Sequence, residues 1–366
     1  MTKAKLSFRR CLLLTVAVVL AAGTLTATPA GAVTLTRTPV ATGLAFPAAF
    51  TFAPDGRIFY GERFTGQVRI VNPSAGSNTL FFTVPGLSTT GEQGLLGIAL
   101  HPGYPSTPNV YLYATRTVGG VAENQIIRVR DVAGVGSAMK VIYRAPASAV
   151  HNGGRIMFGP DKKLYAVVGD RQDPANSQNL GNPHGKILRM TAAGAVPNDN
   201  PFPGSLIWAY GIRNSFGFTF DPLTRAMWET ENGPACNDEL NRIIKGRNYG
   251  WGPSQTCATP PVPPLNTNRD GPNPMLPLGF YNPTTAPTGA AFCSSCGLGA
   301  SAEGHLFYGT YNNRQIREVT LDAQRRVVVS ETLAYTNPDG ILGVERGPDG
   351  ALYFSDRLGI YKLVLS

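Results

Sequence analysis

The chain has little of what marks membrane, nucleic-acid-binding and helical proteins. Only 15% of its 366 residues are charged, four are histidine and five are cysteine. Its one long apolar run, residues 11–22, is well short of the roughly 20 residues needed to span a membrane. Beyond residue 32 no run of lysine and arginine exceeds two residues, which argues against a nucleic-acid footprint. Long apolar patterns of period 3.6 are also missing, so we expect little helix.

The first 32 residues have the pattern of a secretory signal peptide. Four basic residues precede the apolar run, and the small residues at 30–32 offer a cleavage site. We therefore expect residues 1–32 to be removed and residues 33–366 to form one exported domain, secreted or periplasmic. Losing the four basic residues lowers the formal charge from +9 to +5, which is mildly basic.

Four cysteines follow the leader, an even number that favours two disulfides in an exported protein. Three pairings are possible, and we prefer the pairing of sequence neighbours, Cys236 with Cys257 and Cys293 with Cys296. A zinc site is the weaker alternative, because the CSSC motif at 293–296 has neither a second CxxC motif nor a nearby pair of histidines.

A strand–turn–strand unit recurs along the chain. FAPDGRIFYGE at 52–62, FGPDKKLYAVVGD at 158–170 and RGPDGALYFSD at 346–356 share one plan, and 220–233 is a looser copy. Proline and aspartate shape each turn before an apolar, aromatic strand. Such units cannot bury both faces alone, and radial stacking around an axis solves this.

The repeats therefore predict an all-β, six-bladed β-propeller of four-stranded antiparallel blades. At about 40 to 50 residues a blade, the length allows six to eight blades, and the long excursion at 257–292 favours six. A β-sandwich is the alternative. In a propeller, loops leading into the inner strands converge at one end of the axis, so polar groups distant in sequence can meet there.

His151 is one candidate for such a meeting. It precedes Asn152 and two glycines, and the strand pair that follows ends at Asp170. A carboxylate on one ring nitrogen fixes the tautomer of a histidine, an arrangement that suits a general base. The alternative is a histidine that caps a turn.

A second candidate is the pair Arg213 and Asn214, placed between Gly211 and an aromatic strand. We expect both side chains to project from a loop, where an arginine can stabilise developing negative charge. The alternative is an arginine that bridges two blades.

The third candidate is an acidic segment at 229–252. Glu229, Glu231, Asp238 and Glu239 lie close to the carbonyls of 233–234. These are hard oxygen donors, which favour calcium over a transition metal. The spacing is not that of an EF-hand, and a solvated acidic loop is the alternative.

These segments, in this order, resemble the soluble quinoprotein glucose/sorbosone and aldose sugar dehydrogenase family. The resemblance covers most of residues 38–363 and is carried by GEQGLLGIALHPGY at 91–104, HNGGRIMFGPDKKLYAVVGD at 151–170, the stretch 200–222, the acidic segment and GPDGALYFSD at 347–356. It implies a six-bladed propeller that binds pyrroloquinoline quinone (PQQ) and calcium at the axial mouth. The implied reaction oxidises the anomeric carbon of an aldose to a lactone and passes electrons to an acceptor.

The resemblance also implies roles for individual residues. His151 would be the base and Asp170 its supporting carboxylate, while Arg213 and Asn214 would contact the quinone. The first mouth loop places Glu92 where the family usually has glutamine, with Gln93 next to it, so both are candidate cofactor contacts. The remaining matches concern calcium: the carbonyls of Gly233 and Pro234 would hold the cofactor's ion, and Glu239 with the carbonyl of Tyr249 would hold a structural ion.

Three positions depart from the family pattern. Tyr311 stands where the family has a lysine that binds the cofactor's carboxylates, and Gly340 and Leu342 stand at two expected arginines. Two further functions therefore stay open. One is a non-catalytic, calcium-stabilised propeller that binds a glycan or a protein, and the other is a calcium-dependent hydrolase of the lactonase type.

Overall fold

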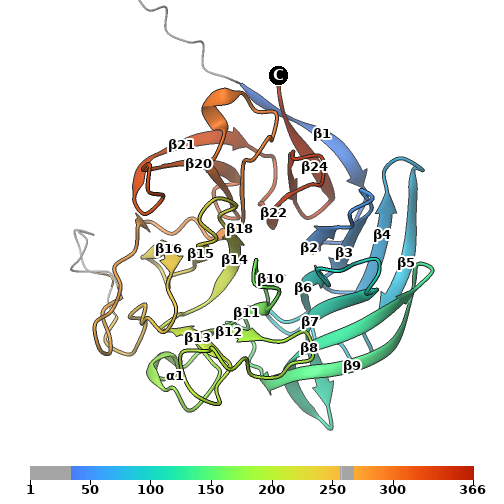
Figure 1. The fold of residues 1–366 in the computed structure, drawn as a ribbon. Helices are drawn as coiled ribbons and strands as arrows, with labels where there is room; N and C mark the ends of the chain where they lie inside the picture. The colour runs from blue at the N-terminus through green and yellow to red at the C-terminus, as the bar shows by residue number, and fades with distance from the viewer. Residues whose placement is uncertain (1–33, 256, 258–267) are drawn as a thin grey trace, which may run out of the picture. The chain divides into compact units, whose positions relative to one another are not determined.

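The computed structural model describes residues 34–255, 257 and 268–366, so the predicted leader lies outside the described residues. Thr34–Ser366 forms one compact unit built of six four-stranded sheets whose neighbouring strands run antiparallel. Within the described residues helix is limited to α1 (Pro174–Gln178) and one 3-10 turn at Ala300–Ala302. The predicted all-β, six-bladed propeller is confirmed (Figure 1).

The six blades follow the order of the chain, and each runs from its innermost to its outermost strand. Blades 1 to 3 are β2 (Pro47–Phe52), β3 (Ile58–Glu62), β4 (Gln67–Asn72), β5 (Ser77–Thr83); β6 (Leu95–Leu100), β7 (Asn109–Val118), β8 (Val121–Val132), β9 (Val135–Pro146); and β10 (Ile156–Phe158), β11 (Leu164–Val168), β12 (Lys186–Met190), β13 (Ile207–Tyr210). Blades 4 to 6 are β14 (Ser215–Phe220), β15 (Met227–Glu231), β16 (Asp238–Ile243), β17 (Gly279–Tyr281); β18 (Pro287–Phe292), β19 (Leu306–Thr310), β20 (Gln315–Leu321), β21 (Val328–Thr336); and β22 (Gly343–Arg346), β23 (Leu352–Ser355), β24 (Gly359–Leu365), β1 (Leu35–Thr42).

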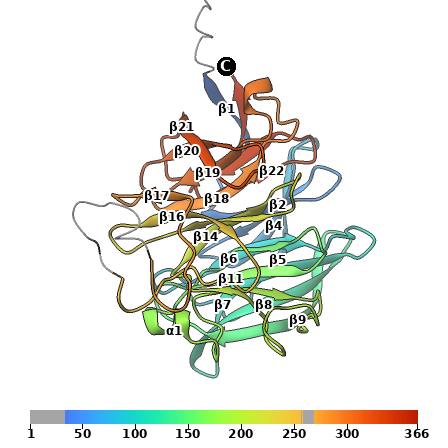
Figure 2. The ribbon, with the colours of Figure 1, turned by 60° about the vertical axis from the view of Figure 1, so that its left-hand side comes forward.

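The first strand of the chain completes the last blade. β1 pairs antiparallel with β24, from Leu35 opposite Leu365 to Thr42 opposite Gly359. In Figure 2 this strand lies beside the segment that carries the C-terminus. The pairing joins the two ends of the described chain and covers a sheet edge that would otherwise be exposed.

The repeated turns connect the first and second strands of their blades. In three of them the aspartate accepts a hydrogen bond from the backbone N–H two residues later, at 3.1 to 3.2 Å: Asp55, Asp161 and Asp349. The residue after Asp55 and Asp349 is a glycine with φ of +86°, a conformation that other residues adopt only with strain. All first strands therefore begin at one end of the axis, and these turns lie at the other.

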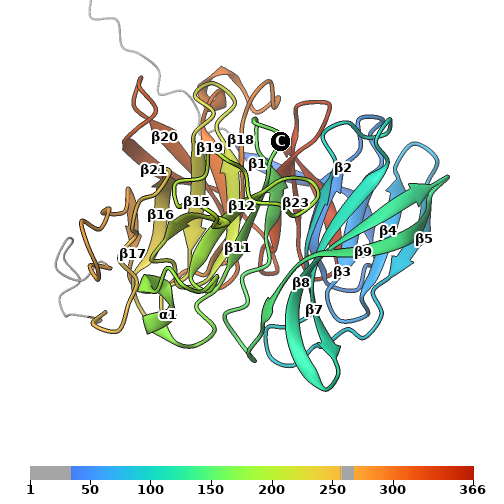
Figure 3. The same cartoon turned by 60° about the horizontal axis from the view of Figure 1, so that its bottom comes forward.

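The hydrophobic core lies between blades rather than inside any one of them. Six clusters of buried side chains occur among the described residues, one for each pair of neighbouring blades. Between blades 3 and 4, for example, Tyr165 and Val167 pack against Phe218 and Met227. The outer strands also meet, since β5 and β9 lie side by side (Figure 3). A single repeat would leave these faces exposed, which explains why the units stack.

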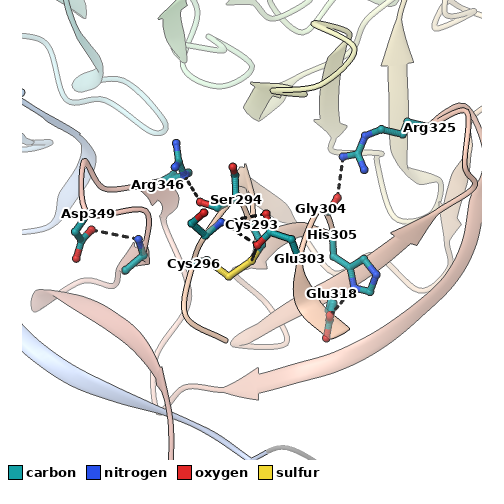
Figure 4. Close-up of a disulfide and its surroundings, with 12 residues drawn as sticks. Cys293, Ser294, Cys296, Glu303, Gly304, His305, Glu318, Arg325, Arg346 and Asp349 are labelled. Carbon is teal, nitrogen blue, oxygen red and sulfur yellow. Dashed lines mark hydrogen bonds and ion pairs between the residues drawn. A yellow bond between two sulfur atoms is a disulfide. The ribbon is translucent and has the colours of Figure 1, made fainter. Parts of the chain in front are cut away.

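Both predicted disulfides are confirmed. Cys236 bonds Cys257 and Cys293 bonds Cys296, with Cα atoms 5.8 and 5.1 Å apart. The second disulfide closes the turn after β18 (Figure 4). There Arg346 of blade 6 donates through Nε to the carbonyl of Ser294 at 2.9 Å, so the loop ties blade 5 to blade 6. The CSSC motif thus clips a turn at the end of the axis opposite the inner-strand starts.

Candidate active site

A cavity of about 410 Å³ opens at the end of the axis where the first strands begin. Its walls are the loops that enter these strands and the loops that join second to third strands, with residues from all six blades. Inner strands from every blade surround this axis in Figure 1. Six of the predicted site residues line the cavity: Glu92, His151, Arg213, Asn214, Gly233 and Pro234.

The histidine and aspartate predicted to act together are in contact. Nδ1 of His151 lies 2.7 Å from Oδ1 of Asp170. Asp170 is fully buried, and its other oxygen accepts a hydrogen bond from Nε1 of Trp251 at 2.8 Å. Because the carboxylate can only accept, the neutral imidazole carries its proton on Nδ1. Nε2 is then the nitrogen with a free lone pair.

The glycines around His151 are required by close approach of two backbone segments. A Cβ on Gly153 would lie 2.4 Å from the carbonyl oxygen of Val167, and one on Gly169 would lie 2.3 Å from that of His151. Gly153 also has φ of +65°. The bare backbone therefore allows the segment before β10 to lie directly on the end of β11, which brings His151 to Asp170.

Glu92 links three blades beneath this pair. Its Oε2 accepts from the backbone N–H of His151 at 2.7 Å and from Nδ2 of Asn214 at 3.2 Å. Oδ1 of Asn214 in turn accepts from the N–H of Gly153 at 3.0 Å. An amide at position 92 would also offer an acceptor here, but the carboxylate adds a negative charge to the cavity wall.

Gln93, the second candidate cofactor contact in this loop, does not line the cavity. Gln93 is 4% exposed. Its Oε1 accepts a hydrogen bond from the Ser88 hydroxyl at 2.5 Å, and its Nε2 donates to the carbonyl of Ser148 at 2.8 Å. Adjacent residues of this loop face opposite ways, so only Glu92 reaches the site.

Arg213 is a fixed cation on the wall next to His151. Its backbone N–H donates to Oε1 of Glu231 at 2.5 Å, and Nη1 donates to the carbonyl of Asn232 at 2.8 Å. The guanidinium also lies over the ring of Trp251, 5.4 Å from its centroid. Burial lowers the pKa of Arg213, while Asp170 and Glu231 oppose the shift. Trp251 thus contacts both Asp170 and Arg213, and the sequence analysis did not single it out.

The acidic segment divides into two parts. Asp238 lines the cavity with Gly233 and Pro234. Its carboxylate accepts from the N–H of Gly233 at 2.8 Å and from those of Thr285 and Ala286 at 2.5 and 2.8 Å. These bonds hold the 233–234 loop against the cavity.

The other acids form a buried cluster on one face of blade 4. Glu231 lies directly opposite Glu239 in the β15–β16 pair, and Glu229 lies opposite Asn241. All four side chains are at most 1% exposed. Like charges directly opposite in a sheet destabilise it, so such a cluster needs a compensating group.

Several oxygens of this cluster have no hydrogen-bond partner among the described residues: Glu229 Oε1, Glu231 Oε2, Glu239 Oε1 and Asn241 Oδ1. Burial raises the pKa of all three carboxyls, to about 8 for Glu229 and Glu239. Tyr249 is buried nearby, and Glu229 adds to the effect of burial in raising the pKa of its phenol. Neither Glu239 nor Tyr249 lines the cavity, so the two predicted calcium positions are separate.

Two of the three positions that differ from the family pattern lie in the cavity wall. Tyr311 and Leu342 line it, and Gly340 does not. A Cβ on Gly340 would come within 2.5 Å of the Tyr311 ring, so this ring occupies the space in which a side chain at 340 would begin.

Sequence reasoning missed two cations of the wall, Arg63 and Arg155. A signal existed for both: Arg155 follows the HNGG motif directly, and Arg63 follows the second strand of blade 1, at the cavity end.

Comparison with known proteins agrees with this architecture. Aldose sugar dehydrogenase YliI from Escherichia coli is 27% identical over 329 residues, 84% of this chain and 86% of that protein. Quinoprotein glucose dehydrogenase B from Acinetobacter calcoaceticus is 33% identical over 238 residues, 56% of this chain and 50% of that protein. The PQQ-bound form of an aldose sugar dehydrogenase from Streptomyces coelicolor superimposes with a TM-score of 0.77 at 28% identity, covering 91% and 98% of the two chains. The profile of one family, Glucose / Sorbosone dehydrogenase, matches residues 44–359, and the chain belongs to that family.

Proposed function

We propose that the protein is an exported, PQQ- and calcium-dependent sugar dehydrogenase that oxidises the anomeric carbon of an aldose to a lactone. The observation that carries this proposal is the His151–Asp170 pair, 2.7 Å apart, in a cavity that also presents Arg213 and Asn214. The names of the relatives point the same way. Export rests on the leader pattern of residues 1–32. Among the described residues no helix has the length and apolarity to span a membrane.

The cavity suits an acidic quinone cofactor. Three arginines line it, Arg63, Arg155 and Arg213, and Asn214 adds an amide. Arginine is the side chain best suited to carboxylates, because its planar fork matches them. When bound there, PQQ would supply the acceptor for the hydride that leaves the anomeric carbon.

The residues of the chain would accept the substrate's proton and stabilise the charge that develops during oxidation. Nε2 of His151 would accept the proton of the anomeric hydroxyl, since Nδ1 is already bonded to Asp170. Asp170 would hold the ring in this orientation and stabilise the imidazolium that forms, a carboxylate role known from other catalytic pairs. Arg213 would face negative charge that develops during oxidation.

Two places suit calcium. The carbonyls of Gly233 and Pro234 border the cavity beside Asp238, and they are the donors proposed for an ion next to the cofactor. Glu229, Glu231 and Glu239 each have a buried oxygen without a hydrogen-bond partner in the described part of the chain, and these oxygens suit a second, structural ion. In the described part of the chain no group of three or more histidine, cysteine, aspartate or glutamate side chains is arranged to hold a metal ion, so carbonyl and amide oxygens would have to complete the coordination.

The direct test uses the mature protein with calcium and added PQQ. We expect a change in the quinone absorption spectrum on binding, followed by reduction of a dye when aldoses are supplied as the small-molecule partner. Absence of both signals with a panel of aldoses would contradict the proposal. Hydrolysis of a lactone without quinone would favour the lactonase-type alternative.

One observation favours a second candidate, a non-catalytic propeller that keeps calcium and binds a glycan or a protein. Tyr311, Gly340 and Leu342 lack the charges that the family resemblance implies for holding the cofactor. Calorimetric titration with PQQ separates the two functions. Micromolar or tighter binding of PQQ would exclude the non-catalytic function, and absence of PQQ binding would support it.

A further inference from the structure

Among the residues that the structure describes, no acidic side chain forms an ion pair at contact distance with the three arginines of the cavity. The ion pairs within 4.0 Å that the structure describes involve neither Arg63 nor Arg155 nor Arg213. The acids of the wall are engaged elsewhere, because Glu92 and Asp238 accept from N–H groups. Acids act on these guanidinium groups from beyond ion-pair distance, Glu92 on Arg63 and Glu345 on Arg155. The guanidinium groups therefore remain available to an anion in the cavity.

The guanidinium of Arg155 lies in the cavity wall and contacts the backbone of Leu342. Nη2 donates to the carbonyl of Leu342 at 3.0 Å and to that of Ala48 at 3.4 Å, and Nε donates to the carbonyl of Phe216 at 3.0 Å. The residue is 6% exposed. Blades 1, 4 and 6 thus fix this guanidinium beside the backbone from which one expected arginine would have projected.

Arg63 holds its charge near position 311. Nη2 donates to the carbonyl of Gly91 at 2.5 Å and Nε to that of Gln93 at 3.2 Å, while the guanidinium lies 4.6 Å from the centroid of the Phe64 ring. Burial lowers the pKa of Arg63, and Glu92 and Tyr311 oppose the shift. The side chain therefore shares a wall with the residue that replaces the expected lysine.

Arginines closer in sequence to the departing positions do not supply this charge, because they do not line the cavity. Arg317 pairs with Glu331 at 2.8 Å, and Arg357 pairs with Asp339 at 2.7 Å. Arg314 donates to the carbonyl of Pro338 and Arg346 to that of Ser294. All four are held by groups outside the cavity wall.

We propose that Arg63 and Arg155, from blades 1 and 3, bind the carboxylates of the quinone in place of side chains at 311, 340 and 342. The proposal rests on the proposed function, since it assumes that PQQ occupies this cavity. It adds to that function by assigning the contacts with the cofactor's carboxylates to blades 1 and 3 instead of blades 5 and 6.

The test is calorimetric titration of the calcium-loaded protein with PQQ, with thermal unfolding of each variant as a check on folding. Arg63→Gln should weaken binding about 10- to 100-fold, the effect of losing one charge-assisted contact. Arg63→Lys keeps the charge and should remain within about 10-fold of the wild type. Arg314→Gln, the matched control outside the cavity, should bind normally. Arg63→Gln binding as tightly as the wild type, or no more weakly than Arg63→Lys, would overturn the proposal.

A second pair of variants covers the case in which Arg63→Gln does not fold. Tyr311 is 38% exposed, so its substitution is tolerated by packing. Tyr311→Glu would place a carboxylate beside Arg63 and should bind PQQ at least about 10-fold more weakly than Tyr311→Gln. Equal binding by these two variants would overturn the proposal. Absence of binding by the wild type would instead refute the proposed function itself.

Discussion

Two polar regions of the propeller differ in how fully they are satisfied. Around His151, the Asp170, Glu92 and Asn214 side chains all have hydrogen-bond partners within the described chain. On one face of blade 4, Glu229, Glu231 and Glu239 each have one oxygen without a hydrogen-bond partner among the described residues. The regions touch, because Glu231 also accepts from the backbone N–H of Arg213.

The difference separates two tasks. A network that is complete on its own is already organised for proton transfer, since no group has to move or arrive to orient the imidazole. A buried carboxylate cluster with open oxygens is incomplete without a cation. We therefore expect changes in the first region to affect turnover, and changes in the second to affect stability and its response to calcium.

The largest expected effect comes from Asp170→Asn. The amide can present a donor to Nδ1 of His151 and so favour the wrong tautomer, with the proton on Nε2. We expect kcat to fall about 10²- to 10⁴-fold, the usual contribution of a positioned general base. Steady-state dye reduction measures this, and PQQ affinity serves as the control. If Asp170→Asn turns over within a few-fold of the wild type, the His151 region would not be the one that determines turnover.

Calcium should act mainly on the second region. Calcium at 100 times its Kd would stabilise the fold by about 2.7 kcal/mol through binding to the native state alone. Thermal unfolding with and without a chelator measures the gain. Glu239→Gln should lose most of it, whereas Glu318→Gln, which alters only a pair with His305, should keep it. An equal calcium response in both variants would place the ion elsewhere.

Trp251→Phe tests the support of Asp170 with a smaller change. It removes the hydrogen bond from Nε1 to Oδ2 but keeps an aromatic ring under Arg213. Hydrogen bonds to charged groups contribute about 1.5 to 3 kcal/mol, so we expect kcat to fall about 10-fold or more. The calcium response in thermal unfolding should be unchanged. A variant that loses its calcium response and keeps its turnover would reverse the assignment of the two regions.

The smallest effect on the site is expected from Cys293→Ser with Cys296→Ser. Chain-entropy arguments give about 2 kcal/mol for a loop this short, and the clip lies at the end of the axis opposite the cavity. Urea unfolding should register the loss, while PQQ affinity and turnover stay unchanged. Altered quinone affinity would show that the two ends of the axis are coupled.

The sequence predicted the fold because turn chemistry and strand alternation repeat locally. It also predicted the meeting of His151 with Asp170, since one residue precedes the first strand of blade 3 and the other follows the second. It missed Arg63 and Arg155, although one follows the second strand of blade 1 and the other follows the HNGG motif, because only the assembled propeller brings these two side chains to one cavity. Gln93 follows Glu92 directly, and in a loop one position is enough to turn a side chain away from the cavity. The glutamates at 229 and 231 were noticed, but only strand register sets Glu231 against Glu239.

The central claim is that His151 takes the sugar's proton inside a cavity that holds the quinone. The most direct measurement is single-turnover reduction of bound PQQ by an aldose, followed by absorbance in wild-type protein and in His151→Gln. We expect both proteins to bind the quinone with similar affinity, and the variant to reduce it about 10²- to 10⁴-fold more slowly. Equal rates of reduction would contradict the claim and leave His151 with a purely structural role.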